Sequence, residues 1–266
     1  MQVYRGMDIG TAKPTTAERA DVPHHLIDIA DPDEEFTVAR FQRAFVDALA
    51  DVERRGRRAL LVGGTGLYLR AVVDGLSLPG RYPDARRAFE GAATTQLHTQ
   101  LTELDPVAAA RMEPSNRRRI VRALEVTVGS GRPFSSYGPG LDAYPPTPFR
   151  LVGVQLQPAA VTARIEARYQ AQLDAGFVDE VRRLDARPEG LSRTAAQALG
   201  YRELLAHVRG EITLDDAVDE AIRRTRQFAR RQRAWFRRDP RIEWLTADAH
   251  PEEVLPSLEA AVAGQT

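Results

Sequence analysis

The amino-acid sequence predicts an α/β fold that carries an all-helical insertion. Residues 59–62 are apolar on both faces, which is typical of a buried parallel strand, and residues 151–156 predict a strand that returns to the same sheet. The first segment runs into a glycine turn at residues 63–66 and then a helix, an order that indicates an α/β unit. From residue 80 to about residue 144 the apolar spacing predicts helices as the only regular elements, the last of them followed by a loop rich in proline, glycine and serine from Gly131 to Pro148. The predicted domains are a core of residues 1–79 and 148–266 and an insertion of residues 80–147.

The other elements follow from apolar spacing and from capping residues. Residues 25–29 predict a short buried strand, and the helix after it begins at the cap Thr37 and ends at Gly56. Within the insertion we predict helices at residues 84–97, 98–104, 106–112 and 116–129. Beyond the strand at 151–156 we predict helices at 159–186, 193–208, 213–238 and 251–263 and a strand at 242–245.

Composition excludes several classes of protein. The 266 residues contain no cysteine, which excludes disulfides, thiolate zinc sites, iron–sulfur clusters and cysteine nucleophiles. No apolar run approaches the ~20 residues that span a membrane, and no signal peptide is expected. Lysine and arginine number 37, as do aspartate and glutamate, so the chain is not a uniformly basic nucleic-acid binder.

Arginine is nevertheless concentrated in two places. Residues 222–238 hold eight arginines and no acid, which favours phosphate contact over a helix face paired with acids elsewhere. A second group lies in the insertion, where Glu113 is the only nearby acid. Its members are Arg111, Arg117, Arg118, Arg119 and Arg122. Two such groups make binding of an extended polyanion more plausible than either alone.

Three other features are candidates for chemistry. The turn at 63–66 exposes backbone N–H groups that favour an anion and places the Thr65 hydroxyl at its edge; the alternative is a tight turn that Thr65 caps. Arg164 and Arg168 are spaced to clamp a pyrophosphate, unless Glu166 or another acid pairs with them. The loop at residues 4–14 offers a cation, a carboxylate and a hydroxyl, and an ordinary surface loop is an equal alternative.

The sequence contains no phosphate-binding P-loop. Lys13 is the only lysine, and Pro14 after it prevents the helix that a P-loop requires. The histidines show no metal-ligand spacing.

Seven collinear segments together resemble the tRNA dimethylallyltransferase (tRNA isopentenylpyrophosphate transferase) family. The segments are MQVYRGMDIGTAKPT at 1–15, PHHLIDI at 23–29, LLVGGTGLYLRAVVDGL at 60–76, DPVAAARM at 105–112, NRRRIVRALEV at 116–126, AAQALGYREL at 195–204 and RRTRQFARRQRAWFRR at 223–238. The resemblance implies a P-loop-kinase-like, ATP-binding type of core. It also implies transfer of a dimethylallyl group from dimethylallyl diphosphate to N6 of adenosine 37 in tRNA, with Mg²⁺ assisting the departing diphosphate. The target base would be flipped into a channel.

The resemblance also assigns site residues and partners. Thr65 is expected to hydrogen-bond the target adenine, and Arg168 to hold the diphosphate. The partners are the anticodon stem-loop of tRNA and dimethylallyl diphosphate, for a cytoplasmic monomer without a membrane. The residues expected to contact tRNA are Met1, Gln2, Arg86, Arg118, Arg119, Ile120, Val121, Arg122, Arg226, Arg230 and Arg231.

One departure from the family pattern bears on activity. Family members place a strand, a P-loop, a helix and a strand ending in Asp-Ser before MQVYRGM, a unit of ~30 or more residues that these 266 residues do not include. The cofactor-binding residues, the metal ligands and the aspartate that accepts the N6 proton belong to that unit. We therefore expect this chain to be poorly stable and nearly inactive, through a misplaced start or a truncated gene. The alternatives are a non-catalytic tRNA-binding remnant and a transferase that acts on free adenine nucleotides.

Overall fold

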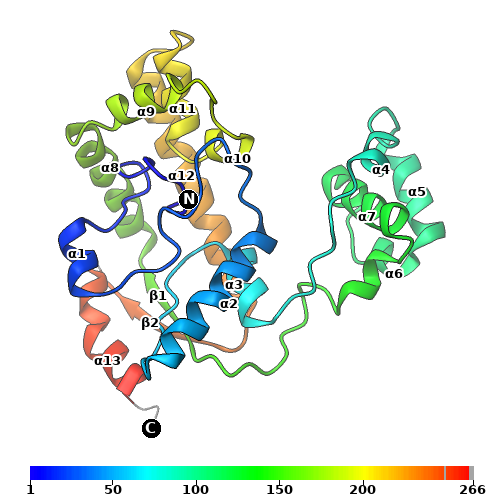
Figure 1. The fold of residues 1–266 in the computed structure, drawn as a ribbon, viewed down its shortest axis with the longest axis horizontal. Coiled ribbons are helices and arrows are strands. Elements are labelled where there is room, and N and C mark those ends of the chain that lie inside the picture. Colours follow the sequence, from blue (N-terminus) through cyan, green and yellow to red (C-terminus); the bar gives the residue numbers. More distant parts are fainter. Residues whose placement is uncertain (249, 264–266) are drawn as a thin grey trace. The chain divides into compact units, whose positions relative to one another are not determined.

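The computed structural model describes residues 1–248 and 250–263 (Figure 1). The chain divides into two compact units, Met1–Leu69 with Pro148–Thr266 and Arg70–Thr147. The division falls inside helix α3 (Gly66–Val73), whereas the sequence prediction draws that boundary at residue 80. No described helix is long and apolar enough to cross a membrane.

The first unit contains a small parallel sheet. Strand β1 (Leu151–Leu156) pairs with β2 (Ile242–Ala247), and Leu151 lies opposite Ile242. Gly153 lies against the Trp244 ring, since a Cβ there would be 2.7 Å from Cζ3 of the ring. A small parallel sheet among many helices agrees with the predicted α/β class.

The predicted strand at residues 59–62 is wrong for this structure. Residues 57–65 have no regular secondary structure, and the side chains of Leu60 and Val62 are 77% and 81% exposed. A parallel strand obtains its hydrogen bonds and its burial from neighbouring strands. No described strand pairs with this segment, so its apolar residues remain open to solvent.

The predicted strand at residues 25–29 is also wrong. Leu26 and Asp28 have φ angles of 64° and 56°, in the left-handed region that extended strands exclude. The segment meets the chain start through backbone hydrogen bonds, such as that from the Ile29 N–H to the Val3 carbonyl at 2.9 Å, and through an isolated parallel bridge between Tyr4 and Ala30.

Helices form most of the first unit, and two of the predicted ones are interrupted. Gly176 and Gly200, with φ angles of 93° and 83°, divide the predicted helices 159–186 and 193–208. Thr37 caps α2 as predicted, accepting from the Arg40 N–H at 3.2 Å. The helices are α1 (Thr16–Asp21), α2 (Val38–Arg54), α3, α8 (Pro158–Asp174), α9 (Phe177–Asp185), α10 (Arg193–Ala196), α11 (Tyr201–Val208), α12 (Leu214–Phe236), η2 (Pro251–Val254) and α13 (Leu255–Ala263).

The core of this unit joins the N-terminal loop to α8, α9, α11 and α12. Tyr4, Met7 and Phe177 are fully buried, and the rings of Phe177 and Tyr201 meet edge to face at 4.9 Å. Gly10 lies so close to these rings that a Cβ there would be 2.2 Å from Phe177. The loop at the start of the chain is therefore part of the hydrophobic core.

The second unit is all helical, as predicted for the insertion. Its core contains Leu97, Leu101, Ile120 and Leu124, each at most 1% exposed. The predicted helix at 84–97 is instead a short helix followed by the start of α5. The helices are α4 (Pro83–Arg87), α5 (Thr94–Leu104), α6 (Pro106–Ala110), α7 (Arg117–Ser130) and η1 (Phe134–Tyr137).

Candidate active site and arginine surfaces

The glycine turn presents Thr65 at the start of α3. The Thr65 carbonyl accepts hydrogen bonds from the N–H groups of Tyr68 at 3.0 Å and Leu69 at 3.1 Å. Thr65 is exposed, and no hydrogen bond joins its hydroxyl to another described residue. The hydroxyl is therefore free to bind a ligand, rather than serving as a cap.

Two side chains of α12 hold the turn from beneath. Gln232 donates its side-chain N–H to the Gly64 carbonyl at 2.8 Å. A Cβ on Gly64 would lie 1.9 Å from Gln232 Nε2, and one on Gly66 would lie 2.1 Å from Trp235 Nε1. Neither glycine has a positive φ angle, so their role here is close approach: a methyl at Gly66 would meet the Trp235 ring, and one at Gly64 would meet the flexible end of Gln232. No local sequence pattern predicts this contact, because Gly64 and Gln232 are 168 positions apart.

Arg168 lines an open hollow of about 570 Å³ beside the N-terminal loop. The guanidinium is exposed and makes no ion pair within the described part of the chain. The predicted alternative, a salt bridge to Glu166, is wrong because Glu166 pairs with Arg226. Other residues lining the hollow are Asp8, Lys13, Arg19, Asp28 and Gln172.

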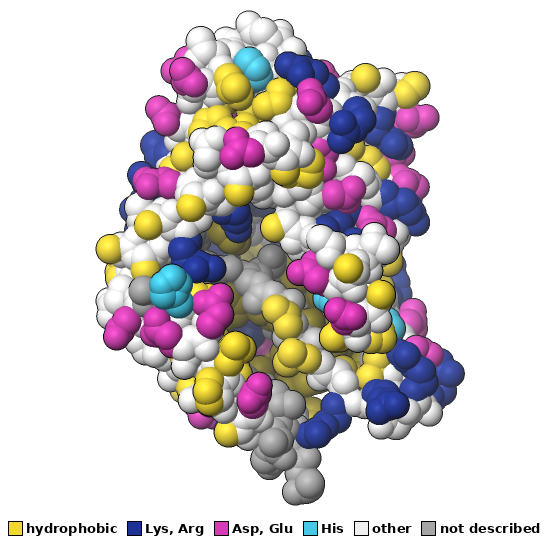
Figure 2. Space-filling model, turned by 90° about the vertical axis from the view of Figure 1, so that its left-hand side faces the viewer, with side chains coloured by type: hydrophobic (Ala, Val, Ile, Leu, Met, Phe, Trp, Pro, Cys, Tyr) yellow, Lys and Arg dark blue, Asp and Glu magenta, His cyan; other side chains and the backbone are white. Residues whose placement is uncertain are grey.

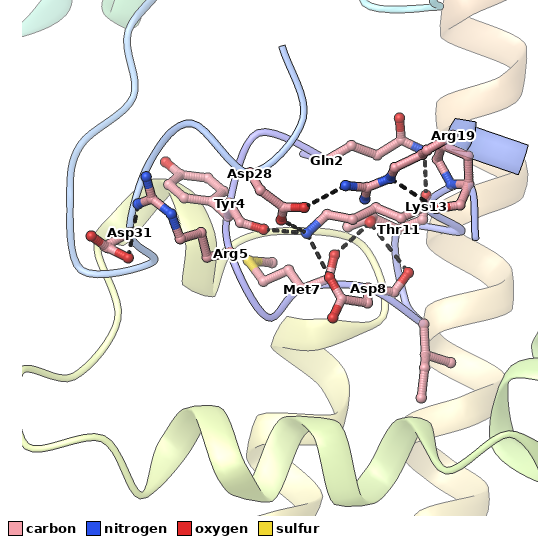
Figure 3. A network of polar contacts seen from close by, with 12 residues as sticks. Gln2, Tyr4, Arg5, Met7, Asp8, Thr11, Lys13, Arg19, Asp28 and Asp31 are labelled. Carbon is pink, nitrogen blue, oxygen red and sulfur yellow. Dashed lines mark hydrogen bonds and ion pairs between the residues drawn. The ribbon is translucent and has the colours of Figure 1, made fainter. Parts of the chain in front are cut away.

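Lys13 lies at the centre of a closed polar network (Figure 3). Its ammonium contacts Asp8 Oδ1 at 2.6 Å, Asp28 Oδ1 at 2.5 Å and the Tyr4 carbonyl at 2.6 Å. An ammonium has three donors, and the side chain is only 3% exposed. Lys13 is therefore a structural cation that shapes the loop and has no donor left for a phosphate.

The same network affects Asp28. Burial alone would raise the pKa of this carboxyl, but hydrogen bonds from Lys13 and Arg19 outweigh burial and hold the pKa below its ordinary value. Asp28 is thus a paired carboxylate at neutral pH, and a weak proton acceptor.

Gln2, one of the predicted tRNA contacts, is also engaged within the loop. Its side-chain amide donates to the carbonyls of Thr11 at 3.1 Å and Ala12 at 2.9 Å. Met1 is 44% exposed.

A buried carboxylate anchors the loop from the opposite side. Glu180 of α9 is 2% exposed and accepts from the backbone N–H groups of Asp8, Ile9 and Gly10. It also accepts from the Tyr201 hydroxyl at 2.6 Å, and burial together with this carboxylate raises the pKa of Tyr201. No pattern in the sequence indicates this role for Glu180, since an acid on a helix is most often a solvated residue.

The arginines of α12 are only partly free, which corrects the prediction. Arg223 pairs with Glu220, Arg224 with buried Glu203, and Arg226 with Glu166. These acids lie outside residues 222–238, on earlier turns or other helices. Three arginines near the end of the helix are exposed and have no partner among the described residues: Arg230, Arg231 and Arg238.

The insertion divides its arginines in a similar way. Arg117 donates to the carbonyls of Phe89, Glu90 and Ala92. Arg86 and Arg122 both bind Glu125, a carboxylate whose side chain is 4% exposed. Arg118 and Arg119 are exposed and make no ion pair with any described residue.

Two predicted tRNA contacts lie in the core of the insertion. Ile120 is fully buried and Val121 is 7% exposed. Both face α7's helical neighbours because they form its apolar stripe, so their side chains are not accessible to an RNA. The segment 118–122 can offer Arg118 and Arg119 instead.

Acidic and basic side chains are interspersed on the face shown in Figure 2, in keeping with the zero net charge. Attraction for a polyanion must therefore arise from local groups of unpaired arginines.

Comparison with known proteins places these features in a family. The family model described as IPP transferase matches residues 2–239. The chain belongs to the IPP transferase family.

Its relatives include proteins named tRNA dimethylallyltransferase. The protein of Roseiflexus castenholzii is 49% identical over 98% of this chain and 86% of its own length. That of Streptomyces coelicolor is 46% identical over 97% of this chain and 83% of its own length. The family resemblance found in the sequence motifs is thus confirmed.

Solved structures of the family share the fold. The tRNA isopentenylpyrophosphate transferase of Bacillus halodurans superposes with a TM-score of 0.70 at 35% identity, covering 99% of this chain and 84% of the other. The Staphylococcus epidermidis protein has a TM-score of 0.68 at 29% identity, covering 100% and 88%. A eukaryotic dimethylallyltransferase that acts on tRNA, at 24% identity, has a TM-score of 0.77 and shows the fold alone.

The described residues do not fit a Mg²⁺ ion held by protein carboxylates. Within residues 1–248 and 250–263, no group of three or more His, Asp or Glu side chains is placed to bind a metal. Mg²⁺ is commonly held by one or two carboxylates together with substrate phosphates. At the Arg168 hollow the two carboxylates, Asp8 and Asp28, are both bound to Lys13. No catalytic step is therefore derived through a metal.

Proposed function

We propose that this chain is a tRNA dimethylallyltransferase that modifies N6 of adenosine 37 in tRNA. The observation that carries the proposal is the state of Thr65 and Arg168. Both are exposed on the first unit, and neither side chain has a partner among the described residues. Relatives of that name, 46–49% identical over nearly the whole chain, support the same function.

The reaction assigns a task to each of these side chains. The N6 atom attacks the allylic carbon of dimethylallyl diphosphate, the carbon–oxygen bond breaks, and the diphosphate leaves with the bonding electrons. Negative charge develops on the departing group, and an unpaired guanidinium such as Arg168 stabilises it. The Thr65 hydroxyl would hydrogen-bond the adenine and fix its orientation.

N6 also loses one proton in this reaction. Asp8 and Asp28 are the carboxylates that line the hollow with Arg168, and both are bound to Lys13. We assign the role of base to neither, and the departing diphosphate can take up the proton. We propose a P-loop-kinase-like core for the first unit. The exposed Leu60 and Val62 support such a core, because a neighbouring parallel strand would bury them.

Recognition of tRNA would use the free arginines of each unit. Arg118 and Arg119 on α7 and Arg230 and Arg231 on α12 are exposed and suited to phosphate contacts. The target base must leave its stack to reach Thr65, as in other enzymes that act on a base. We propose that the protein works as a monomer in the cytoplasm, where tRNA and the diphosphate donor meet.

A transfer assay tests this function. The substrates are labelled dimethylallyl diphosphate and a tRNA whose anticodon loop carries adenosines 36 and 37, with a guanosine 37 transcript as control. We expect transfer to the adenosine transcript and not to the guanosine transcript. Binding of tRNA without transfer would indicate a non-catalytic tRNA-binding protein. Transfer to AMP that tRNA does not inhibit would indicate a nucleotide-modifying enzyme.

The role of Thr65 is tested separately. Thr65→Ala should lower the rate of dimethylallyl transfer more than it lowers tRNA affinity, because the hydroxyl contacts one base and not the phosphates. Equal losses of rate and affinity would contradict the assignment.

A further inference from the structure

The turn that carries Thr65 has little rigidity of its own. Thr65 lies between Gly64 and Gly66, and the preceding residues 57–64 have no regular secondary structure. Glycine has greater backbone freedom than other residues, and exposed segments with few contacts open most easily. A hydroxyl that must meet one atom of a base therefore requires an external support.

Helix α12 provides that support at two adjacent points. Gln232 donates to the Gly64 carbonyl at 2.8 Å, and the Trp235 indole lies against Gly66. The carbonyl of Gly64 belongs to the peptide bond that precedes Thr65, so this hydrogen bond fixes the orientation of the peptide that carries the hydroxyl-bearing residue.

The same helix also holds the element that bears Arg168. The Thr225 hydroxyl of α12 is hydrogen-bonded to the Tyr169 hydroxyl of α8 at 2.9 Å in the interior. Arg226 of α12 pairs with Glu166 of α8. Tyr169 and Glu166 flank Arg168 in sequence. Helix α12 thus contacts both the turn that carries Thr65 and the helix that carries Arg168.

We propose that Gln232 is a positioning residue, which acts through the Gly64 carbonyl to hold Thr65 at the target adenine. The inference rests on the proposed function, because the role of Thr65 is assigned there. It explains why Gly64 carries no side chain: a methyl group would occupy the place of the Gln232 amide.

The first test measures the turn without RNA. Gln232→Met keeps the length of the side chain and removes the donor, and Gln227→Met on the same helix is the matched control. Hydrogen exchange of the peptide that covers residues 63–69 should become faster in Gln232→Met and stay unchanged in the control. Equal exchange in the wild type and Gln232→Met would overturn the proposal.

The second test measures base selectivity. Two anticodon stem-loops that differ only in adenosine or guanosine at position 37 are titrated with each variant, and the ratio of their dissociation constants is compared. A single hydrogen bond lost at the turn should reduce the adenosine preference by about three- to tenfold, with an unchanged salt dependence. If Gln232 had only a general structural role, its substitution would weaken binding of both RNAs equally, and that result would overturn the proposal.

A double variant gives a test that does not depend on the folding of Gln232→Met. In Gly64→Ala the new methyl displaces only the flexible end of Gln232, so selectivity should fall as it does in Gln232→Ala. The double variant Gly64→Ala/Gln232→Ala should then resemble either single variant, because both remove the same contact. Additive losses would contradict the proposal. A wild type without any adenosine preference would reject the proposed function of Thr65, while the exchange experiment would still decide whether Gln232 orders the turn.

Discussion

Helices α7 and α12 are the two arginine-rich helices of the molecule, and they use their arginines differently. On α7, Arg117 and Arg122 donate to backbone carbonyls of their own unit, and Arg122 also binds Glu125. On α12, the early arginines pair with carboxylates, among them Glu203 of α11. On α7 two of the four arginines remain free, and on α12 Arg223, Arg224 and Arg226 are paired, so the number of arginines in a sequence overstates the charge that can reach a phosphate.

The difference has an energetic consequence. A guanidinium bound to carbonyls replaces hydrogen bonds that water could also supply, whereas one that neutralises a buried carboxylate compensates a charge. Paired arginines should therefore determine stability, and free arginines should determine RNA affinity.

Removal of the carboxylate shared by two arginines should have the largest effect. Glu125 accepts from Arg86, Arg122 and the Tyr82 N–H, and it is nearly buried. Glu125→Ala should lower the free energy of unfolding by about 3 kcal/mol, because it leaves these donors unpaired. Urea titration followed by circular dichroism measures the loss, with exposed Glu113→Ala as the control. A loss no greater than that of the control would contradict the structural role of this cluster.

The α12 pair should show a smaller loss of the same kind. Arg224→Ala leaves Glu203 buried without its partner, and we expect the free energy of unfolding to fall by about 2 kcal/mol. Arg231→Ala, at an exposed position of the same helix, should change it by less than about 0.5 kcal/mol. Equal unfolding midpoints for the two variants would remove the distinction between paired and free arginines on this helix.

RNA binding should show the opposite ranking. Arg118→Ala and Arg231→Ala should each weaken binding to an anticodon stem-loop and flatten the slope of log affinity against log salt by roughly 0.7–0.9. Arg117→Ala should leave the slope unchanged, because its guanidinium is bound to carbonyls of the insertion. Fluorescence titrations at several salt concentrations measure the slopes, and a slope that changes only for Arg117 would reverse the assignment.

The smallest expected effect on stability is that of Asp28, a carboxylate that pairs with Lys13 as well as with an arginine. The pKa of Asp28 is lowered in the folded state, so its contribution to stability is present above its ordinary pKa of 3.8. That contribution is lost as the pH falls through the lowered value. Asp28→Asn should therefore be less stable than the wild type at neutral pH, and the difference should shrink in acid. Thermal unfolding between pH 2 and 7 tests this, with exposed Asp21→Asn as the control; a difference independent of pH would contradict it.

Local signals in the sequence predicted the elements that local physics determines. The cap Thr37, the strand at residues 151–156 and the start of the helix predicted at 213–238 lie where the pattern indicates. The prediction of a strand at 59–62 was wrong, because burial of Leu60 and Val62 depends on neighbouring strands, which a local pattern does not reveal. Thr65 lies in a family motif, and Arg168 could be named from its spacing to Arg164 together with the family resemblance. Their supports, Gln232 and Tyr169, could not, because these contacts join helices that are distant in sequence.

The most direct test of the account is a competition for the protein between its tRNA and an unrelated polyanion. The protein is bound to an anticodon stem-loop with adenosine 37, and heparin or a scrambled RNA of equal charge is added at constant salt. We expect a preference for the stem-loop of at least about tenfold, because the free arginines and Thr65 act together. Equal displacement by the unrelated polyanion would show that these arginines attract charge alone, and would contradict the proposed recognition of tRNA.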